Sequence, residues 1–104
     1  MFNQSTQQSQ KMMMRPTQQT TRSLFVGDLS FFCTEIELAG AFSRFGEVLN
    51  TEVKRSRGGD SLMHGFVDFA HESNALLAIQ HMNGQKFMGR KLKYVHWTNN
   101  YYVL

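Results

Sequence analysis

The sequence contains very little that could cross-link the chain or hold a metal. Its 104 residues include one cysteine, Cys33, so an internal disulfide bond is impossible. A zinc site built from cysteines is excluded for the same reason. A single thiol in an apolar segment is typical of a small buried side chain, and we expect Cys33 to be buried. Cysteine usage of this kind is typical of a reducing compartment.

Long apolar runs are also absent. No stretch approaches the roughly 18–20 apolar residues that are needed to cross a bilayer. The first residues, MFNQSTQQSQKMMMRP, do not form the basic region and apolar stretch of a secretory signal. We therefore expect a soluble intracellular protein of the nucleus or cytoplasm, with no membrane partner.

Catalytic patterns are missing as well. The sequence contains no paired carboxylates, no nucleophile with an adjacent base and no GxxxxGK[ST] phosphate loop. The RGGD segment is too short to indicate more than a turn, and the histidines lack metal-ligand spacing. We expect neither catalysis nor a cofactor or metal.

The charge of the chain is mildly positive. A formal net charge of +3 and a pI of about 9.3 point only weakly to nucleic acid. The basic residues cluster as KRSR at 54–57 and RKLK at 90–93. Two clusters of this kind form one patch if the fold brings them together.

Composition divides the chain into one domain and two tails. Residues 1–21 are rich in Gln, Ser, Thr and Met, and such a segment is typical of a disordered tail. Residues 22–98 are predicted to form the domain, and residues 99–104 a C-terminal tail.

Within the domain, strand and helix patterns alternate. Strands are predicted at 23–29, 48–55, 64–69 and 90–97, and helices at 34–46 and 71–84. Thr34 and Glu37 form a capping-box pattern at the start of the first helix. The apolar stripes of the two helices are Ile36, Leu38, Ala39, Phe42 and Phe45, and Ala75, Leu76, Ile79 and Met82.

The resulting β-α-β-β-α-β order predicts an α+β, ferredoxin-like split β-α-β fold. In this fold a four-stranded antiparallel sheet carries both helices on one face. The other face is therefore open to solvent or to a partner.

Side-chain alternation indicates what this open face displays. Leu24, Val26, Val67 and Phe69 form the uniformly apolar sets and are expected to face the helices. Phe25, His64 and Phe66 are then expected on the open face. On the last strand we expect Leu92 and Tyr94 to point inward, and Lys91, Lys93 and Val95 to point toward the open face.

Three flat rings flanked by basic clusters form a stacking platform for the bases of a single-stranded nucleic acid. Two alternatives remain open: the rings belong to the core, or the C-terminal tail covers them. Tyr101 and Tyr102 either extend the platform or fold back over it.

Two segments resemble the signatures of the RNA recognition motif (RRM) family. LFVGDL at 24–29 matches the hexamer, with Asp28 where the family has Asn. LMHGFVDF at 62–69 matches the last five positions of the octamer K/R-G-F/Y-G/A-F-V-x-F/Y. Leu62, Met63 and His64 depart from its first three positions.

The resemblance implies that Phe25 and Phe66 stack on two bases and that His64 contacts the sugars between them. Lys54, Arg55 and Arg57 would hold phosphates in place of the cation that Leu62 removes. The second basic cluster, with Lys91 and Lys93, would hold further phosphates. The choice of bases would depend on contacts with the base edges from a further set of residues: Asn50, Glu52, Lys93, Val95 and the C-terminal tail.

We therefore expect a monomeric RRM that binds single-stranded RNA in mRNA processing or post-transcriptional regulation, with other RNA-processing proteins as further partners. The alternative is a protein-interaction module that binds a peptide through the helical side and the Phe87 loop. A subset of RRM-like domains uses an Arg-x-Phe motif for this purpose. Here Gln85 stands where that arginine would be, and the sheet aromatics that this subset tends to lose are kept.

Overall fold

The computed structural model describes residues 19–99. Six longer elements follow one another along the chain: β1 (Gln19–Gly27), α1 (Glu35–Phe42), β2 (Val48–Arg55), β3 (Ser61–Phe69), α2 (Glu72–Met82) and β6 (Tyr94–Asn99). The short elements are a 3-10 turn (Ser43–Phe45) after α1 and the strands β4 (Lys86–Phe87) and β5 (Arg90–Lys91). None of the helices in this part of the chain has the length and apolar character that a membrane span requires.

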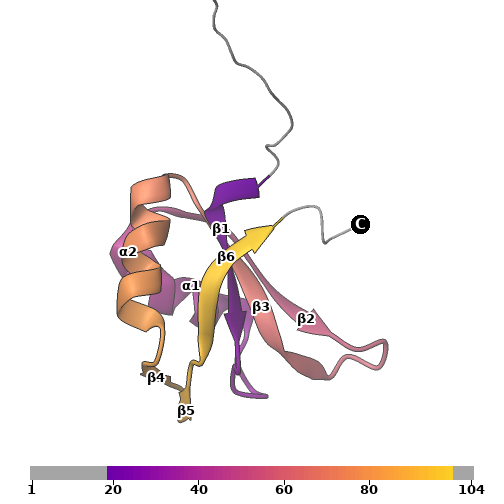
Figure 1. Ribbon diagram of the computed structural model, residues 1–104. Coiled ribbons are helices and arrows are strands. Elements are labelled where there is room, and N and C mark those ends of the chain that lie inside the picture. Colours follow the sequence, from indigo (N-terminus) through magenta and orange to yellow (C-terminus); the bar gives the residue numbers. More distant parts are fainter. Residues whose placement is uncertain (1–18, 100–104) are drawn as a thin grey trace, which may run out of the picture.

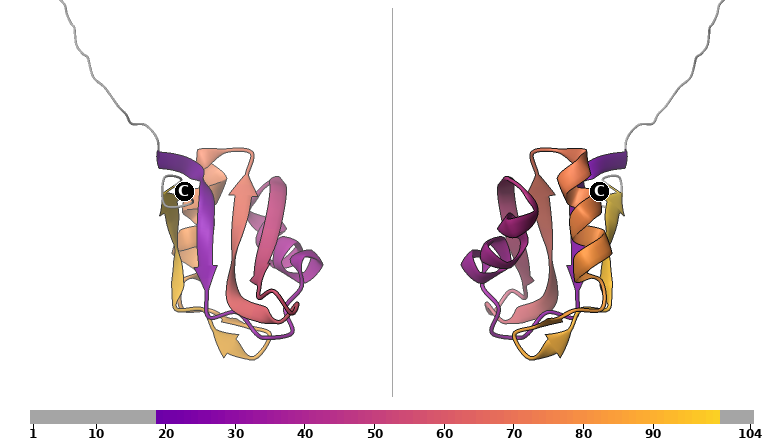
Figure 2. Two further views of the ribbon diagram at one scale, coloured as in Figure 1. Left: turned by 90° about the vertical axis from the view of Figure 1, so that its right-hand side faces the viewer. Right: turned by 90° about the vertical axis from the view of Figure 1, so that its left-hand side faces the viewer.

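The long strands form one antiparallel sheet in the order β2-β3-β1-β6. Both helices lie on the same side of it. The right panel of Figure 2 shows α1 and α2 in front of the sheet, and the left panel shows the face that they leave uncovered. The predicted β-α-β-β-α-β fold with one open sheet face is therefore confirmed.

One hydrophobic core lies between the sheet and the helices. Leu24, Val26, Val67 and Phe69 from β1 and β3 are each at most 1% exposed, as the alternation of side chains predicts. The helices contribute a second set of buried residues: Leu38, Phe42, Ala75, Ala78 and Met82. Cys33 is buried in the same core, which confirms its predicted position.

The first helix begins where the sequence predicts. The Thr34 side chain accepts a hydrogen bond from the Glu37 backbone N–H, and the Glu37 carboxylate accepts one from the Thr34 N–H at 3.0 Å. The capping box is therefore confirmed.

Two residues of the predicted helical stripes point to solvent. Ile36 is 84% exposed and Leu76 is 46% exposed. In α1 the buried pair is Leu38 and Phe42, and a residue two positions before Leu38 lies on the opposite side of the helix. In α2 the buried face is centred on two alanines, Ala75 and Ala78, which places Leu76 at its margin.

Two strands begin earlier than the sequence predicts. β1 starts at Gln19, so residues 19–21 belong to the sheet and not to the predicted tail. β3 starts at Ser61, and the register between β2 and β3 shifts between Val53 and Arg55. Met63 has a φ of 64° at this irregularity.

The predicted strand 90–97 is wrong in its first half. Arg90–Lys91 pairs with Lys86–Phe87 in a separate hairpin, and only Tyr94–Asn99 joins the main sheet (Figure 1). Between them Leu92 leaves the ladder: it donates its N–H to the Gln85 carbonyl, and its own carbonyl accepts from the Gly84 N–H.

This break reverses the alternation of the residues that follow. Val95 is 1% exposed and lies in the core, whereas Tyr94 is 56% exposed. The expected orientations of Val95 toward the open face and of Tyr94 toward the core are therefore both wrong. A strand pattern continued through Leu92 and Lys93 assigns the wrong face to each residue after them.

Close approach of β2 to β3 explains one glycine. A Cβ added to Gly65 would collide with the backbone oxygen of Glu52. Gly40 lies on the exposed side of α1, and apart from its chain neighbours and the backbone of its own helix no heavy atom lies within 4 Å of the position that its Cβ would take.

We predict opposite effects for alanine at these two positions. Gly65→Ala should lower the free energy of unfolding by about 1–3 kcal/mol because the strands must separate to admit the methyl group. Gly40→Ala should raise it by roughly 0.5–1 kcal/mol because alanine restricts the unfolded chain. Urea denaturation of both variants measures the difference. A Gly65→Ala protein as stable as the parent would contradict the close approach.

Candidate nucleic-acid interface

Three predicted residues meet on the helix-free face of the sheet. Phe25 of β1 lies directly across from Phe66 of β3 in the strand register, and their ring centroids are 5.7 Å apart. The His64 ring lies 5.4 Å from that of Phe25. All three side chains are half-buried. The grouping of these rings on the open face agrees with the sequence prediction. It contradicts the alternative that the rings belong to the core.

Strand β6 adds two rings that the sequence analysis missed. His96 pairs with Phe25 in register, and their rings are stacked with centroids 5.2 Å apart. Tyr94 pairs with Gly27. A Cβ on Gly27 would lie 3.0 Å from Phe25 Cε2 and 3.1 Å from Tyr94 Cβ. Because glycine has no side chain, Phe25 and Tyr94 can both pack close to this position.

We call the set Phe25, His64, Phe66, Tyr94 and His96 the aromatic platform. It spans the three neighbouring strands β3, β1 and β6. The signal that could have revealed its β6 part is the apolar Val95: with Val95 assigned to the core, both of its neighbours fall on the open face.

Backbone carbonyls fix the orientation of both imidazoles. His64 Nδ1 lies 3.2 Å from the Leu62 carbonyl oxygen, and His96 Nδ1 lies 2.9 Å from the Trp97 carbonyl oxygen. Since a carbonyl oxygen only accepts, Nδ1 is the donor in both contacts. The platform therefore carries polar ring nitrogens beside its apolar rings.

Strand β2 adds polar groups at one edge of the platform. Glu52 lies across from Phe66, and Asn50 lies across from Asp68. The Lys54 ammonium is 5.7 Å from the Phe66 ring centroid and 3.1 Å from the Glu52 carboxylate. Asn50, Glu52 and Lys54 thus alternate along β2 on the same face as the aromatic platform.

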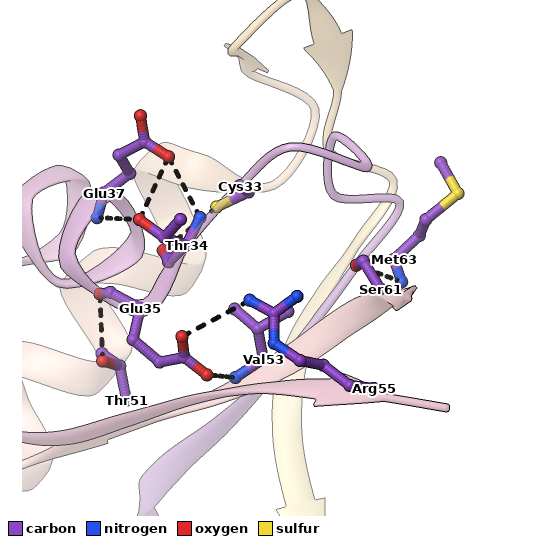
Figure 3. A network of polar contacts seen from close by, with 9 residues as sticks. All are labelled: Cys33, Thr34, Glu35, Glu37, Thr51, Val53, Arg55, Ser61 and Met63. Carbon is purple, nitrogen blue, oxygen red and sulfur yellow. Dashed lines mark hydrogen bonds and ion pairs between the residues drawn. The ribbon is translucent and has the colours of Figure 1, made fainter. Parts of the chain in front are cut away.

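Arg55 does not join this face. Its guanidinium lies 3.6 Å from the carboxylate of Glu35 in α1, and the same carboxylate accepts a hydrogen bond from the Val53 N–H at 2.8 Å (Figure 3). Arg57 is exposed in the turn between β2 and β3. Of the cluster at 54–57, only Lys54 contacts a platform ring.

The second basic cluster, at 90–93, lies in β5 and in the segment that leads to β6. Lys91 is exposed in β5. Arg90 and Lys93 lie 2.6 Å and 3.8 Å from the two carboxylate oxygens of Asp28. Tyr101 and Tyr102 lie outside the described residues.

Two ionisable groups near α1 have shifted pKa values. Burial raises the pKa of the Cys33 thiol to about 11, so the thiol stays protonated at neutral pH, and its sulfur lies 3.5 Å from the Thr34 carbonyl oxygen. The hydrogen bond from Val53 lowers the pKa of the Glu35 carboxyl. Among residues 19–99, no group of three or more His, Cys, Asp or Glu side chains is placed to hold a metal ion.

These features define an α+β domain with one uncovered sheet face that carries aromatic residues. The model of the RNA recognition motif family matches residues 24–93, which is more than half of the chain. The chain therefore belongs to the RNA recognition motif family.

Individual relatives agree with this assignment. "Small RNA-binding protein 11, chloroplastic" from Arabidopsis thaliana is 41% identical over 70 residues, which are 66% of this chain and 48% of that protein. Human cleavage stimulation factor subunit 2 is 34% identical over 73 residues, which are 69% of this chain and 13% of that protein. The chain thus spans less than half the length of these relatives.

A solved structure shows the same fold. The second RRM domain of the yeast poly(U)-binding protein superposes with a TM-score of 0.68 and is 35% identical in sequence. The match covers 74% of this chain and 93% of that domain.

We predict that Glu35 stabilises the fold in a pH-dependent way. Glu35→Ala should lower the free energy of unfolding by roughly 1 kcal/mol at pH 7, because the Val53 N–H loses its partner. The folded pKa of Glu35 lies below its ordinary value of 4.5. This stabilisation is therefore present above the unfolded pKa and is lost as the pH falls through the folded one.

Urea denaturation at pH 7 and pH 3 measures the effect. The difference in the free energy of unfolding between the parent and Glu35→Ala should be smaller at pH 3 than at pH 7. Glu72→Ala, which removes a carboxylate from α2, serves as the control. A Glu35→Ala gap that stays constant between the two pH values would contradict this role of the carboxylate.

Proposed function

We propose that this domain binds single-stranded RNA on the aromatic platform. The observation that carries the proposal is the pairing of Phe25 and Phe66, two half-buried aromatic rings on the sheet face that no helix covers. Covering an apolar ring on an open sheet face with a flat, apolar partner lowers the free energy of the complex. An unpaired base is such a partner, and stacking contributes about 1–3 kcal/mol per base.

In this mode two successive bases stack on Phe25 and Phe66. His64 and His96 lie on either side of Phe25, and their ring nitrogens contact the sugars through the ribose 2′-hydroxyls. Lys54, above the Phe66 ring, supplies a cation for the adjoining phosphate. Two or three stacked bases give an affinity of roughly micromolar, or about −8 kcal/mol.

The step that this binding serves is proposed from the relatives. The sequence identity of 34% to human cleavage stimulation factor subunit 2 supports a role in mRNA processing or post-transcriptional regulation. The name of the yeast poly(U)-binding protein supports a single-stranded RNA ligand. Other RNA-processing proteins are then the expected further partners.

Peptide binding through the Phe87 loop receives less support. Phe87 is half-buried and packs against the core from β4, so its ring is engaged within the domain. Gln85 also lacks the charge of the arginine in the Arg-x-Phe motif.

We predict that each platform phenylalanine contributes separately to RNA affinity. Phe25→Ala and Phe66→Ala should each weaken binding by about 5- to 150-fold, which corresponds to the loss of one stacked base. Fluorescence anisotropy with a random-sequence single-stranded RNA pool measures the change.

The matched control is Ile36→Ala, which removes an exposed apolar side chain from α1 and should leave affinity unchanged. Circular dichroism checks that each variant is folded. Folded Phe25→Ala and Phe66→Ala proteins that bind as well as the parent would rule out the proposed platform.

Lys54 and Arg55 provide a second test because they are adjacent in sequence but lie on opposite sides of the sheet. Lys54→Ala should weaken binding several-fold and reduce the slope of log K against log salt by roughly 0.7, the value for one single-strand phosphate. Arg55→Ala should change neither quantity. Equal losses in the two variants would mean that RNA does not follow the platform.

A further inference from the structure

Asp28 holds two cations at the end of β1. Its carboxylate accepts a hydrogen bond from Arg90 Nη2 at 2.6 Å, and Lys93 Nζ lies 3.8 Å from the other carboxylate oxygen. The Arg90 Nε also donates to the Asp28 backbone carbonyl at 3.3 Å. Asp28 thereby ties the β4–β5 hairpin and the segment before β6 to the end of the central strand.

Asp28 directly follows the last residue of β1 at one end of the aromatic platform. Gly27, the preceding residue, pairs with His64 on one side and with Tyr94 on the other. Lys93 directly precedes Tyr94 in the chain. Asp28 and Lys93 therefore adjoin, along the chain, two residues that pair in register at this end of the platform.

These cations are suited to phosphate. The Arg90 side chain is 44% exposed and that of Lys93 is 63% exposed, so an RNA strand can reach both. Carboxylate and phosphate oxygens accept from a guanidinium in the same way, so they compete for one donor set. The hydrogen bond from Arg90 lowers the pKa of the Asp28 carboxyl, so the group is charged at neutral pH.

We propose that Asp28 acts as an internal competitor for RNA phosphate and thereby sets the affinity of the platform. The proposal rests on the proposed RNA-binding function. While the carboxylate holds Arg90 and Lys93, a phosphate gains these cations only by displacing it. The RRM hexamer signature has Asn at this position, a side chain of nearly the same shape that carries no charge.

Asparagine at position 28 is a conservative test of this role. Asp28 has a φ of 64°, a left-handed conformation that Asn also adopts readily. The bond from Arg90 to the backbone carbonyl does not depend on the side chain. Asp28→Asn therefore removes the charge and leaves the local backbone unchanged.

The experiment compares Asp28→Asn with the parent by anisotropy with a single-stranded RNA pool over a series of salt concentrations. Affinity at low salt should rise about 3- to 10-fold, and the slope of log K against log salt should steepen by roughly 0.7 for each phosphate gained. Arg90→Ala/Asp28→Asn should lose most of this gain. Glu72→Gln removes a carboxylate from α2 and should leave both quantities unchanged.

The possible outcomes separate the two proposals. If the parent binds RNA and a folded Asp28→Asn protein binds with equal or lower affinity, the competitor role is overturned and the platform stands. The competitor role is also overturned if Glu72→Gln raises affinity as much as Asp28→Asn. If the parent does not bind RNA, the proposed function fails and the competitor role fails with it.

Discussion

Side chains alternate along β1 and β3, and both helices cover the same face of the sheet, so the two central strands serve two surfaces at once. Leu24, Val26, Val67 and Phe69 close the core, and the residues between them point away from it. Phe25 and Phe66 are thereby held beside each other by the same register that packs the core. The geometry of the platform is a consequence of the fold and needs no loop to form it.

The platform is wider than the three rings that the sequence predicts. Its surroundings are also less basic than the clusters at 54–57 and 90–93 suggest. His96 and Tyr94 extend it onto the edge strand β6, next to Phe25 and Gly27. Two acids are paired with cations: Glu52 on this face with Lys54, and Asp28 at the end of β1 with Arg90 and Lys93. On this surface RNA phosphates compete with these carboxylates for the cations, so base stacking carries the larger share of the proposed affinity.

Local patterns were sufficient to predict most of the fold. The capping box at Thr34 and the apolar alternation of β1 and β3 depend on near neighbours in sequence, and the structure confirms both. The last strand was not predictable in this way. Its phase is set by the hydrogen bonds of Leu92 with Gln85 and Gly84, two residues of the segment after α2, and strand alternation does not reveal these partners.

The candidate site shows the same division. Phe25, His64 and Phe66 lie on strands of regular alternation, and the structure places them together. Uninterrupted alternation along the last strand puts Val95 on the open face and His96 on the other side. The structure reverses both positions because both residues lie after the break at Leu92 and Lys93. The partner of Arg55 is a helix residue, Glu35, and strand pattern alone does not show which face of the sheet a residue at a register shift will take.

The most direct test of this account is to map where RNA contacts the protein. Backbone amide resonances of the labelled protein can be followed while a single-stranded RNA pool is added. The account predicts shifts at Phe25, Phe66, Tyr94 and His96 and at Lys54, with the outer faces of α1 and α2 unchanged. Shifts confined to the helices and to the Phe87 hairpin, with the platform unchanged, would contradict it.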